Sequence, residues 1–215
     1  MTDALFQDRR GAGRALAQRL SGYADRPDVR VLALPRGGVP VGFEVGQALH
    51  APLDVLVVRK LGAPDHEELA LGAIAPGVCH VNQRLVQELC IDPERLDRIV
   101  EQEQVELARR ERLYREGRPP LDVHGACVIV VDDGLATGAT MRAAVLALRA
   151  MAPARVVVAV PVAAQDTCAA LRCEADEVVC VATPYPFVAV GLWYRDFSQT
   201  SDDEVRDLLA QAASP

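Results

Sequence analysis

The sequence predicts an α/β domain in which an open, mainly parallel sheet is flanked by helices. Five short runs rich in β-branched residues recur along the chain, and helical stretches separate them. Several of the runs are apolar almost throughout, as strands covered on both faces must be. With 215 residues, of which 50% are hydrophobic and 25% charged, the chain can bury one sizeable core.

The first half of the chain is expected to begin with a helix at residues 9–21. Val-Arg-Val-Leu-Ala-Leu at 29–34 then predicts a strand, a helix follows at 39–49, and Leu-Asp-Val-Leu-Val-Val at 53–58 predicts a second strand. This alternation is typical of parallel sheets, whose strands need crossover connections.

A long helix is expected at residues 93–116. Asp92 is a good N-cap and Pro93 suits the first helical position. Its apolar residues form a sparse stripe among many Glu and Arg, which indicates a surface position. Either a solvated flanking helix or a dimer contact would explain this pattern, so a homodimer stays open.

The second half continues the alternation, and we see no linker or repeat that would divide the chain. Strands are expected at 126–131, 155–160 and 177–181, and helices at 138–151, 164–173 and 202–212.

Composition excludes several classes of function. The balance of 23 Lys and Arg against 30 Asp and Glu gives a net charge of −7, which argues against a nucleic-acid groove but leaves a local phosphate pocket open. We expect no membrane segment and a cytoplasmic location, because the chain has neither a long apolar run nor a signal peptide pattern. Its six cysteines show no metal-binding spacing and are expected to be reduced, mostly buried thiols.

The most informative stretch runs from residue 128 to 141, Val-Ile-Val-Val-Asp-Asp-Gly-Leu-Ala-Thr-Gly-Ala-Thr-Met. A buried strand leads into Asp132 and Asp133 and then into a loop of small residues before a helix. Glycine lets the backbone approach a ligand, and the helix start offers free N–H groups to a phosphate. The acids suit ribose hydroxyls or hydrated Mg²⁺. The alternative is a capped helix with solvated acids.

This stretch closely resembles the phosphoribosyl pyrophosphate signature of the type I phosphoribosyltransferases. The resemblance implies their fold, an open sheet with a small hood over its edge. It also implies that Asp132 and Asp133 hold the ribose and, directly or through water, Mg²⁺. The 5′-phosphate would bind the loop made of Ala136, Thr137, Gly138, Ala139 and Thr140.

Two further loops fit the same family. Arg36, Gly37 and Gly38 look like its pyrophosphate loop, in which an Arg in a glycine turn makes a good anion fork. Residues 58–72 occupy the place of its flexible loop, with Arg59 and Lys60 at the root and His66, Glu67 and Glu68 inside it. Arg36 and Lys60 are the expected catalytic residues, and Arg59 is expected to bind substrate.

The segment at about residues 183–200 is expected to form the hood. It contains Tyr185, Phe187, Trp193 and Tyr194, and we predict that Trp193 belongs to the substrate site. A packed aromatic subcore is the alternative.

The resemblance implies one domain over residues 1–215, with a core at about 27–182 and a flanking helix at each end. It further implies transfer of phosphoribose to a nitrogen acceptor, a nucleobase, in nucleotide salvage, with release of pyrophosphate. Ala136 stands where the hypoxanthine-guanine enzymes carry an acid, which argues against a 6-oxopurine acceptor. The rival interpretation is a catalytically silent regulator that senses the donor.

Overall fold

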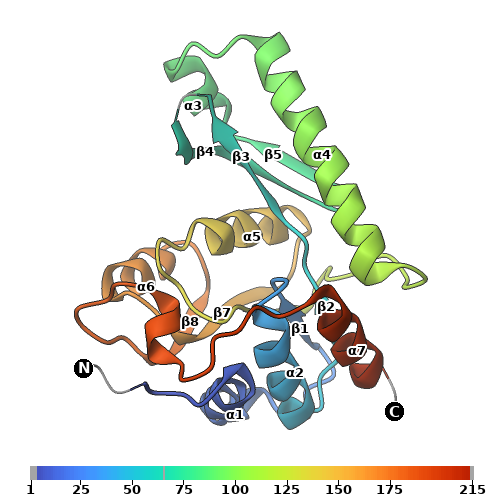
Figure 1. Ribbon diagram of the computed structural model, residues 1–215. Coiled ribbons are helices and arrows are strands. Elements are labelled where there is room, and N and C mark those ends of the chain that lie inside the picture. The colour runs from blue at the N-terminus through green and yellow to red at the C-terminus, as the bar shows by residue number, and fades with distance from the viewer. Residues whose placement is uncertain (1–3, 65, 214–215) are drawn as a thin grey trace.

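The computed structural model describes residues 4–64 and 66–213 and has the expected α/β architecture (Figure 1). Its main sheet runs in the order β2-β1-β6-β7-β8, and all neighbouring strands are parallel. The strands are β1 (Val29–Ala33), β2 (Leu53–Val55), β6 (Cys127–Val131), β7 (Arg155–Val162) and β8 (Glu177–Ala182). From β1 the chain moves to one side of the sheet and from β6 to the other. The strand order therefore reverses between these two neighbours, where open α/β sheets bind ligands.

Helices cover both faces of this sheet. One buried cluster joins it to α1 (Arg9–Arg19), α2 (Gly38–Leu49) and α7 (Asp202–Ala212). A second cluster joins the opposite face to α5 (Ala139–Ala150) and α6 (Gln165–Leu171). A short 3₁₀ helix, η1 (Ser21–Tyr23), follows α1. Successive residues of a strand point to opposite faces of the sheet and pack in different clusters. This explains why the strands are apolar almost throughout.

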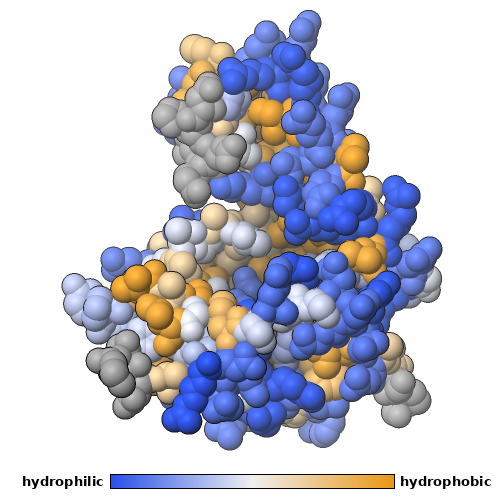
Figure 2. All heavy atoms as spheres, in the orientation of Figure 1, coloured by the Kyte–Doolittle hydropathy of each residue, from blue (hydrophilic) through white to orange (hydrophobic). Residues whose placement is uncertain are grey.

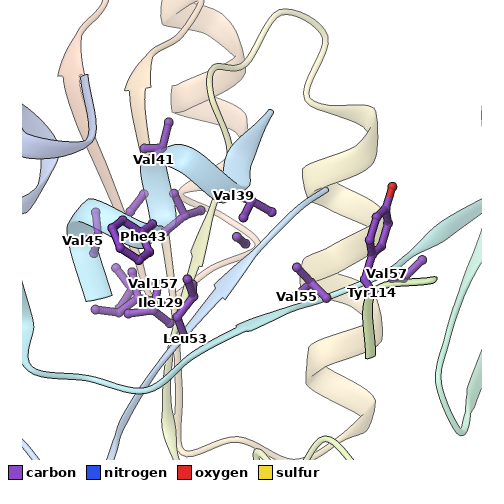
Figure 3. Packing of buried hydrophobic residues seen from close by; sticks show 14 of the residues in the cluster. Val39, Val41, Phe43, Val45, Leu53, Val55, Val57, Tyr114, Ile129 and Val157 are labelled. Atoms are coloured by element: carbon purple, nitrogen blue, oxygen red, sulfur yellow. The ribbon is translucent and has the colours of Figure 1, made fainter. Parts of the chain in front are cut away.

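The first cluster is centred on α2. Figure 3 shows Phe43 of this helix beside Ile129 and Val157 of the sheet, and Phe43 is only 2% exposed. Replacing such a side chain by Ala typically costs about 3–5 kcal/mol of stability. This packing fixes the start of α2, and with it the loop after β1.

A second layer, residues 59–115, stands apart from the main sheet and next to α5 (Figure 1). It consists of an antiparallel sheet of β3 (Arg59–Ala63), β4 (His66–Ala75) and β5 (Val78–Val81), followed by α3 (Gln83–Glu88) and α4 (Pro93–Arg115). Helix α4 packs on β3 and β4 and reaches α7 at its far end. We call residues 59–115 the upper layer.

Helix α4 begins as the sequence predicts, since the Asp92 side chain accepts a hydrogen bond from the Glu94 amide at 3.0 Å. Its outward side is hydrophilic in Figure 2, whereas Leu107 and Tyr114 are buried against the core. In the described part of the chain no helix is long and apolar enough to cross a membrane.

The segment expected to be the flexible loop contains a hairpin of β3 and β4, and its mobility stays a prediction. Leu61, Leu71 and Ile74 are at most 1% exposed and join the main core cluster. This part of the chain therefore buries apolar surface that a polar lid would lack. Strand β5 and helix α3 were also not predicted.

Candidate active site

Two loops meet where the strand order reverses. Residues 34–38 follow β1, residues 132–138 follow β6, and the two strands pair directly. A Cβ atom on Gly37 would lie 2.0 Å from Asp133 Oδ2, and one on Gly38 would lie 2.7 Å from the carbonyl oxygen of the last residue of β6. Both positions need glycine, because a side chain would push the loops apart.

Asp132 and Asp133 form a partly buried acidic pair, in which the Asp133 amide donates to Asp132 Oδ1 at 2.8 Å. Burial raises the pKa of the Asp132 carboxyl well above its usual range, and the charge of Asp133 raises it further. Burial also raises the pKa of Asp133, while the guanidinium of Arg9, 2.8 Å from Oδ2, opposes that rise. The pair offers hydrogen-bond acceptors to a diol or a hydrated cation.

The loop after the acids leads into the N-terminus of α5. Gly138 has φ +73°, a left-handed conformation that favours glycine, and a Cβ there would lie 2.6 Å from Thr167 Cγ2. The Thr167 hydroxyl donates to the Ala136 carbonyl at 2.6 Å and so fixes the loop. Thr137 and Thr140 are exposed beside the first turn of the helix. Its N–H groups and positive dipole end suit a phosphate group, and we call this helix start the phosphate cradle.

A cavity of about 690 Å³ lies between the end of β1, the start of α5 and the upper layer, and its described lining does not include Asp132 or Asp133. It is lined by the ends of β1 and β2, the β3–β4 hairpin, one face of α4 and the start of α5. Arg59, Lys60, Arg95 and Arg110 bring positive charge to its wall, and Glu103 brings a negative charge. This balance suits a polyanionic ligand.

The structure unites some of the expected pyrophosphate-binding side chains here. Arg59 and Lys60 both line the cavity, and Arg59 Nε lies 2.6 Å from Glu103 Oε2 of α4. The side chains of His66, Glu67 and Glu68 lie outside the described part of the chain.

The Arg36 side chain contacts helix α7. The described lining includes the two residues before it but not Arg36 itself, whose Nη1 lies 3.7 Å from Asp202 Oδ1 of α7. The Tyr114 hydroxyl donates to the same carboxylate at 2.5 Å. Burial and this hydrogen bond raise the pKa of Tyr114 to about 12. In this structure Arg36 therefore contacts α7, and its expected role in pyrophosphate binding stays a prediction.

The expectation that Trp193 binds substrate is wrong in this structure. Its side chain is buried, with 5% exposed, and its ring stacks on Phe187 at 6.3 Å between centroids. Tyr194 is equally buried, and both belong to a cluster with Phe6 of the N-terminal segment. The aromatic subcore is therefore the correct alternative for Trp193 and Tyr194, whereas Tyr185 is exposed.

Sequence reasoning missed Arg9, and it listed Tyr194 only as an aromatic residue of the hood. The Tyr194 hydroxyl donates to the Asp133 carbonyl at 2.5 Å, and Arg9 pairs with the Asp133 side chain. Arg9 directly follows Asp8, the N-cap of α1, and resembles any other basic residue of a surface helix. No local pattern indicates a contact with a residue 124 positions away.

The acidic pair fits Mg²⁺ that binds together with a phosphorylated ligand. In the described part of the chain, no group of three or more His, Cys, Asp or Glu residues could hold a metal ion alone. Mg²⁺ keeps several waters and commonly binds one or two carboxylates plus substrate phosphates. Asp132 and Asp133 are the residues that would hold it, with the ligand completing the coordination.

Together, the glycine turn, the two acids and the helix N-terminus lie at the switch point of an open sheet, and their chemistry suits a phosphorylated sugar. Comparison with known proteins assigns the family. The phosphoribosyl transferase domain model matches residues 2–191, so the chain belongs to that family, as its resemblance implied.

Several proteins share the fold. The crystal structure of TT1426 from Thermus thermophilus has a TM-score of 0.89 and 41% identity, covering 97% of this chain and 99% of that one. Rv0571c of Mycobacterium tuberculosis, provisionally named a phosphoribosyl transferase, is 50% identical over 209 residues, covering 97% of this chain and 47% of that protein. The chain therefore spans about half the length of the curated relatives it matches. A hypoxanthine-guanine phosphoribosyltransferase of Bacillus anthracis shares the fold at 11% identity, with a TM-score of 0.50 and coverage of 91% and 94%.

Proposed function

We propose that the protein transfers the phosphoribosyl group of 5-phosphoribosyl 1-pyrophosphate to a nitrogen atom of a nucleobase and releases pyrophosphate. One observation carries this proposal: the backbone of Gly37 lies against the Asp133 carboxylate, while the phosphate cradle of α5 begins five residues further on. In this proposal the diol would bind between two sites for phosphate groups, in the order that the donor requires.

Each part of the donor has a counterpart. Asp132 and Asp133 would accept hydrogen bonds from the ribose hydroxyls, and residues 136–140 would bind the 5′-phosphate. Pyrophosphate would lie between the glycine turn and the cationic wall of the cavity, which includes Arg59 and Lys60.

In the reaction, the bond between ribose C1 and the pyrophosphate oxygen breaks, and the acceptor nitrogen forms a bond to C1. Positive charge develops on the ribose and negative charge on the leaving group, so catalysis consists of positioning and electrostatic stabilisation. Lys60 would stabilise pyrophosphate as it departs. Arg36 would join it by exchanging its 3.7 Å contact with Asp202 for the leaving group. Mg²⁺ bound with the donor supplies additional positive charge.

The acceptor is proposed to bind beside residues 187–190. A Cβ atom on Gly134 would lie 2.5 Å from Val190 Cγ1, so this segment lies directly on the loop after β6. Phe187 is half-buried and Tyr185 is 90% exposed, which leaves these two rings available for stacking. Cytoplasmic nucleotide salvage is the proposed setting. The expectation that most cysteines are buried is wrong, because only Cys127 and Cys168 are buried.

The test is an assay of pyrophosphate release with the donor, Mg²⁺ and a panel of purine and pyrimidine bases. We expect release that depends on one base or a small group of bases. Donor binding without release for any base would identify a donor-sensing protein instead. Failure to bind the donor at all would contradict both functions.

A further inference from the structure

Arg9 of α1 reaches into the acidic pair although it lies outside every loop of the signature. Its Nε is 2.8 Å from Asp133 Oδ2, its Nη1 donates to the Ser198 carbonyl at 2.6 Å, and its guanidinium lies 3.9 Å from the centroid of the Phe197 ring. The Arg9 side chain is only 12% exposed. Such a contact set holds an arginine in one position.

The chain around Arg9 is fixed as well. The Phe6 amide donates to the Trp193 carbonyl at 3.0 Å, and the Arg195 amide donates back to Phe6 at 2.9 Å. The Asp8 side chain then caps α1 by accepting from the Gly11 amide at 2.6 Å. The N-terminal segment is therefore bonded to η2 (Val190–Trp193) and the residues after it, and these bonds fix the position of Arg9.

From these contacts we infer that Arg9 is a positioning residue of the donor site. Arg9 holds Asp133 so that the acidic pair binds the ribose diol rather than a divalent cation without the donor. This inference rests on the proposed function. Arg9 Nε lies 3.2 Å from where a Cβ of Gly37 would be, so the guanidinium, the glycine turn and the carboxylate meet at one point. The Arg9 guanidinium occupies Asp133 Oδ2 and leaves Asp133 Oδ1 for a ribose hydroxyl.

The positive charge of Arg9 also affects which ligand the acidic pair binds. Asp132 and Asp133 are adjacent in sequence and partly buried, and burial disfavours two uncompensated negative charges there. Without Arg9, such a pair would attract a hydrated divalent cation on its own. The guanidinium removes one unit of that negative charge. The pair then hydrogen-bonds to neutral hydroxyls and attracts a cation only when a phosphorylated ligand supplies further oxygens.

The experiment compares Arg9→Gln, Arg9→Lys and wild type in two binding measurements. Calorimetric titration gives affinity for the donor with Mg²⁺, and electron paramagnetic resonance gives affinity for Mn²⁺ alone. Arg10→Gln is the matched control, because Arg10 is the next residue of the same helix and pairs with Glu44 at 2.6 Å, away from the acids. Thermal unfolding of each variant checks that the fold is retained.

For Arg9→Gln we expect about tenfold weaker donor binding, in the range found when a group that orients a ligand-binding side chain is removed. We also expect Mn²⁺ to bind about tenfold more tightly, because a neighbouring positive charge is lost. Arg9→Lys keeps the positive charge and should bind Mn²⁺ as weakly as wild type does. Arg10→Gln should match wild type in both measurements. If Arg9 had only a structural role, its replacement by Gln would not increase the affinity for Mn²⁺.

Unchanged donor affinity or unchanged Mn²⁺ affinity in Arg9→Gln would overturn the inference, as would equal effects in Arg10→Gln. If wild type fails to bind the donor, the proposed function fails, and the Mn²⁺ measurement still decides whether Arg9 controls the charge of the acidic pair.

Discussion

Replacing Gly37 by Ala tests the contact between the glycine turn and the acidic pair. Gly37 has φ −59° and ψ −30°, a conformation that Ala adopts without strain. The new methyl group, however, would lie 2.0 Å from Asp133 Oδ2 and 2.7 Å from Asp133 Cγ. The carboxylate must move by about 1 Å or more to reach an ordinary van der Waals distance.

The expected loss follows from that displacement. Moving Asp133 breaks its bond to Arg9 and removes a charge-assisted hydrogen bond to the ribose. Such a bond contributes about 1.5–3 kcal/mol, so the Kd for the donor should rise about tenfold to a hundredfold.

Isothermal titration with the donor and Mg²⁺ measures this change. Gly22→Ala is the control, because nothing lies within 4 Å of a Cβ atom at that exposed position. If Gly37→Ala binds the donor with an affinity within about twofold of wild type, the glycine turn does not approach Asp133 as described.

Three further predictions concern the rest of the site. Gly138→Val should weaken donor binding by at least about tenfold, because the position has a positive φ and a Cβ there would lie 2.6 Å from Thr167 Cγ2; titration calorimetry at wild-type affinity would contradict the phosphate cradle. Asp132→Asn should raise stability by about 0.5–2 kcal/mol at neutral pH. Since burial raises the folded-state pKa of Asp132, wild type should lose stability as pH rises from the ordinary Asp pKa through that raised value, and parallel stability profiles for wild type and variant in thermal unfolding would contradict this. Lys60→Ala should lower turnover more than donor affinity, and equal losses in kinetics and titration would indicate simple anchoring of the ground state instead.

The main sheet could be predicted because its information is local. The run at 126–131 is apolar throughout, and strand β6 forms within it as Cys127–Val131. Asp92 as the N-cap and Pro93 as the first helical residue likewise mark the start of α4. Such signals depend on neighbours in sequence, which a pattern can show.

The hairpin and the site contacts depend on distant residues. Leu61 and Leu71 lie in a segment with Gly, Pro and charged residues, which is typical of a loop, and only packing on the core gives it strand structure. Trp193 was assigned to the substrate site because aromatic residues suit both stacking and packing, and its burial decides between them. Arg9 reaches Asp133 only because the fold brings α1 to the end of β6.

The central claim is that the acidic pair and its loops bind 5-phosphoribosyl 1-pyrophosphate. The most direct test is calorimetric titration of wild type and Asp133→Asn with the donor and Mg²⁺. We predict saturable binding to wild type, binding to the variant that is weaker by about tenfold or more, and an intact fold in both. Equal affinity in the two proteins, or no binding to wild type, would contradict the claim.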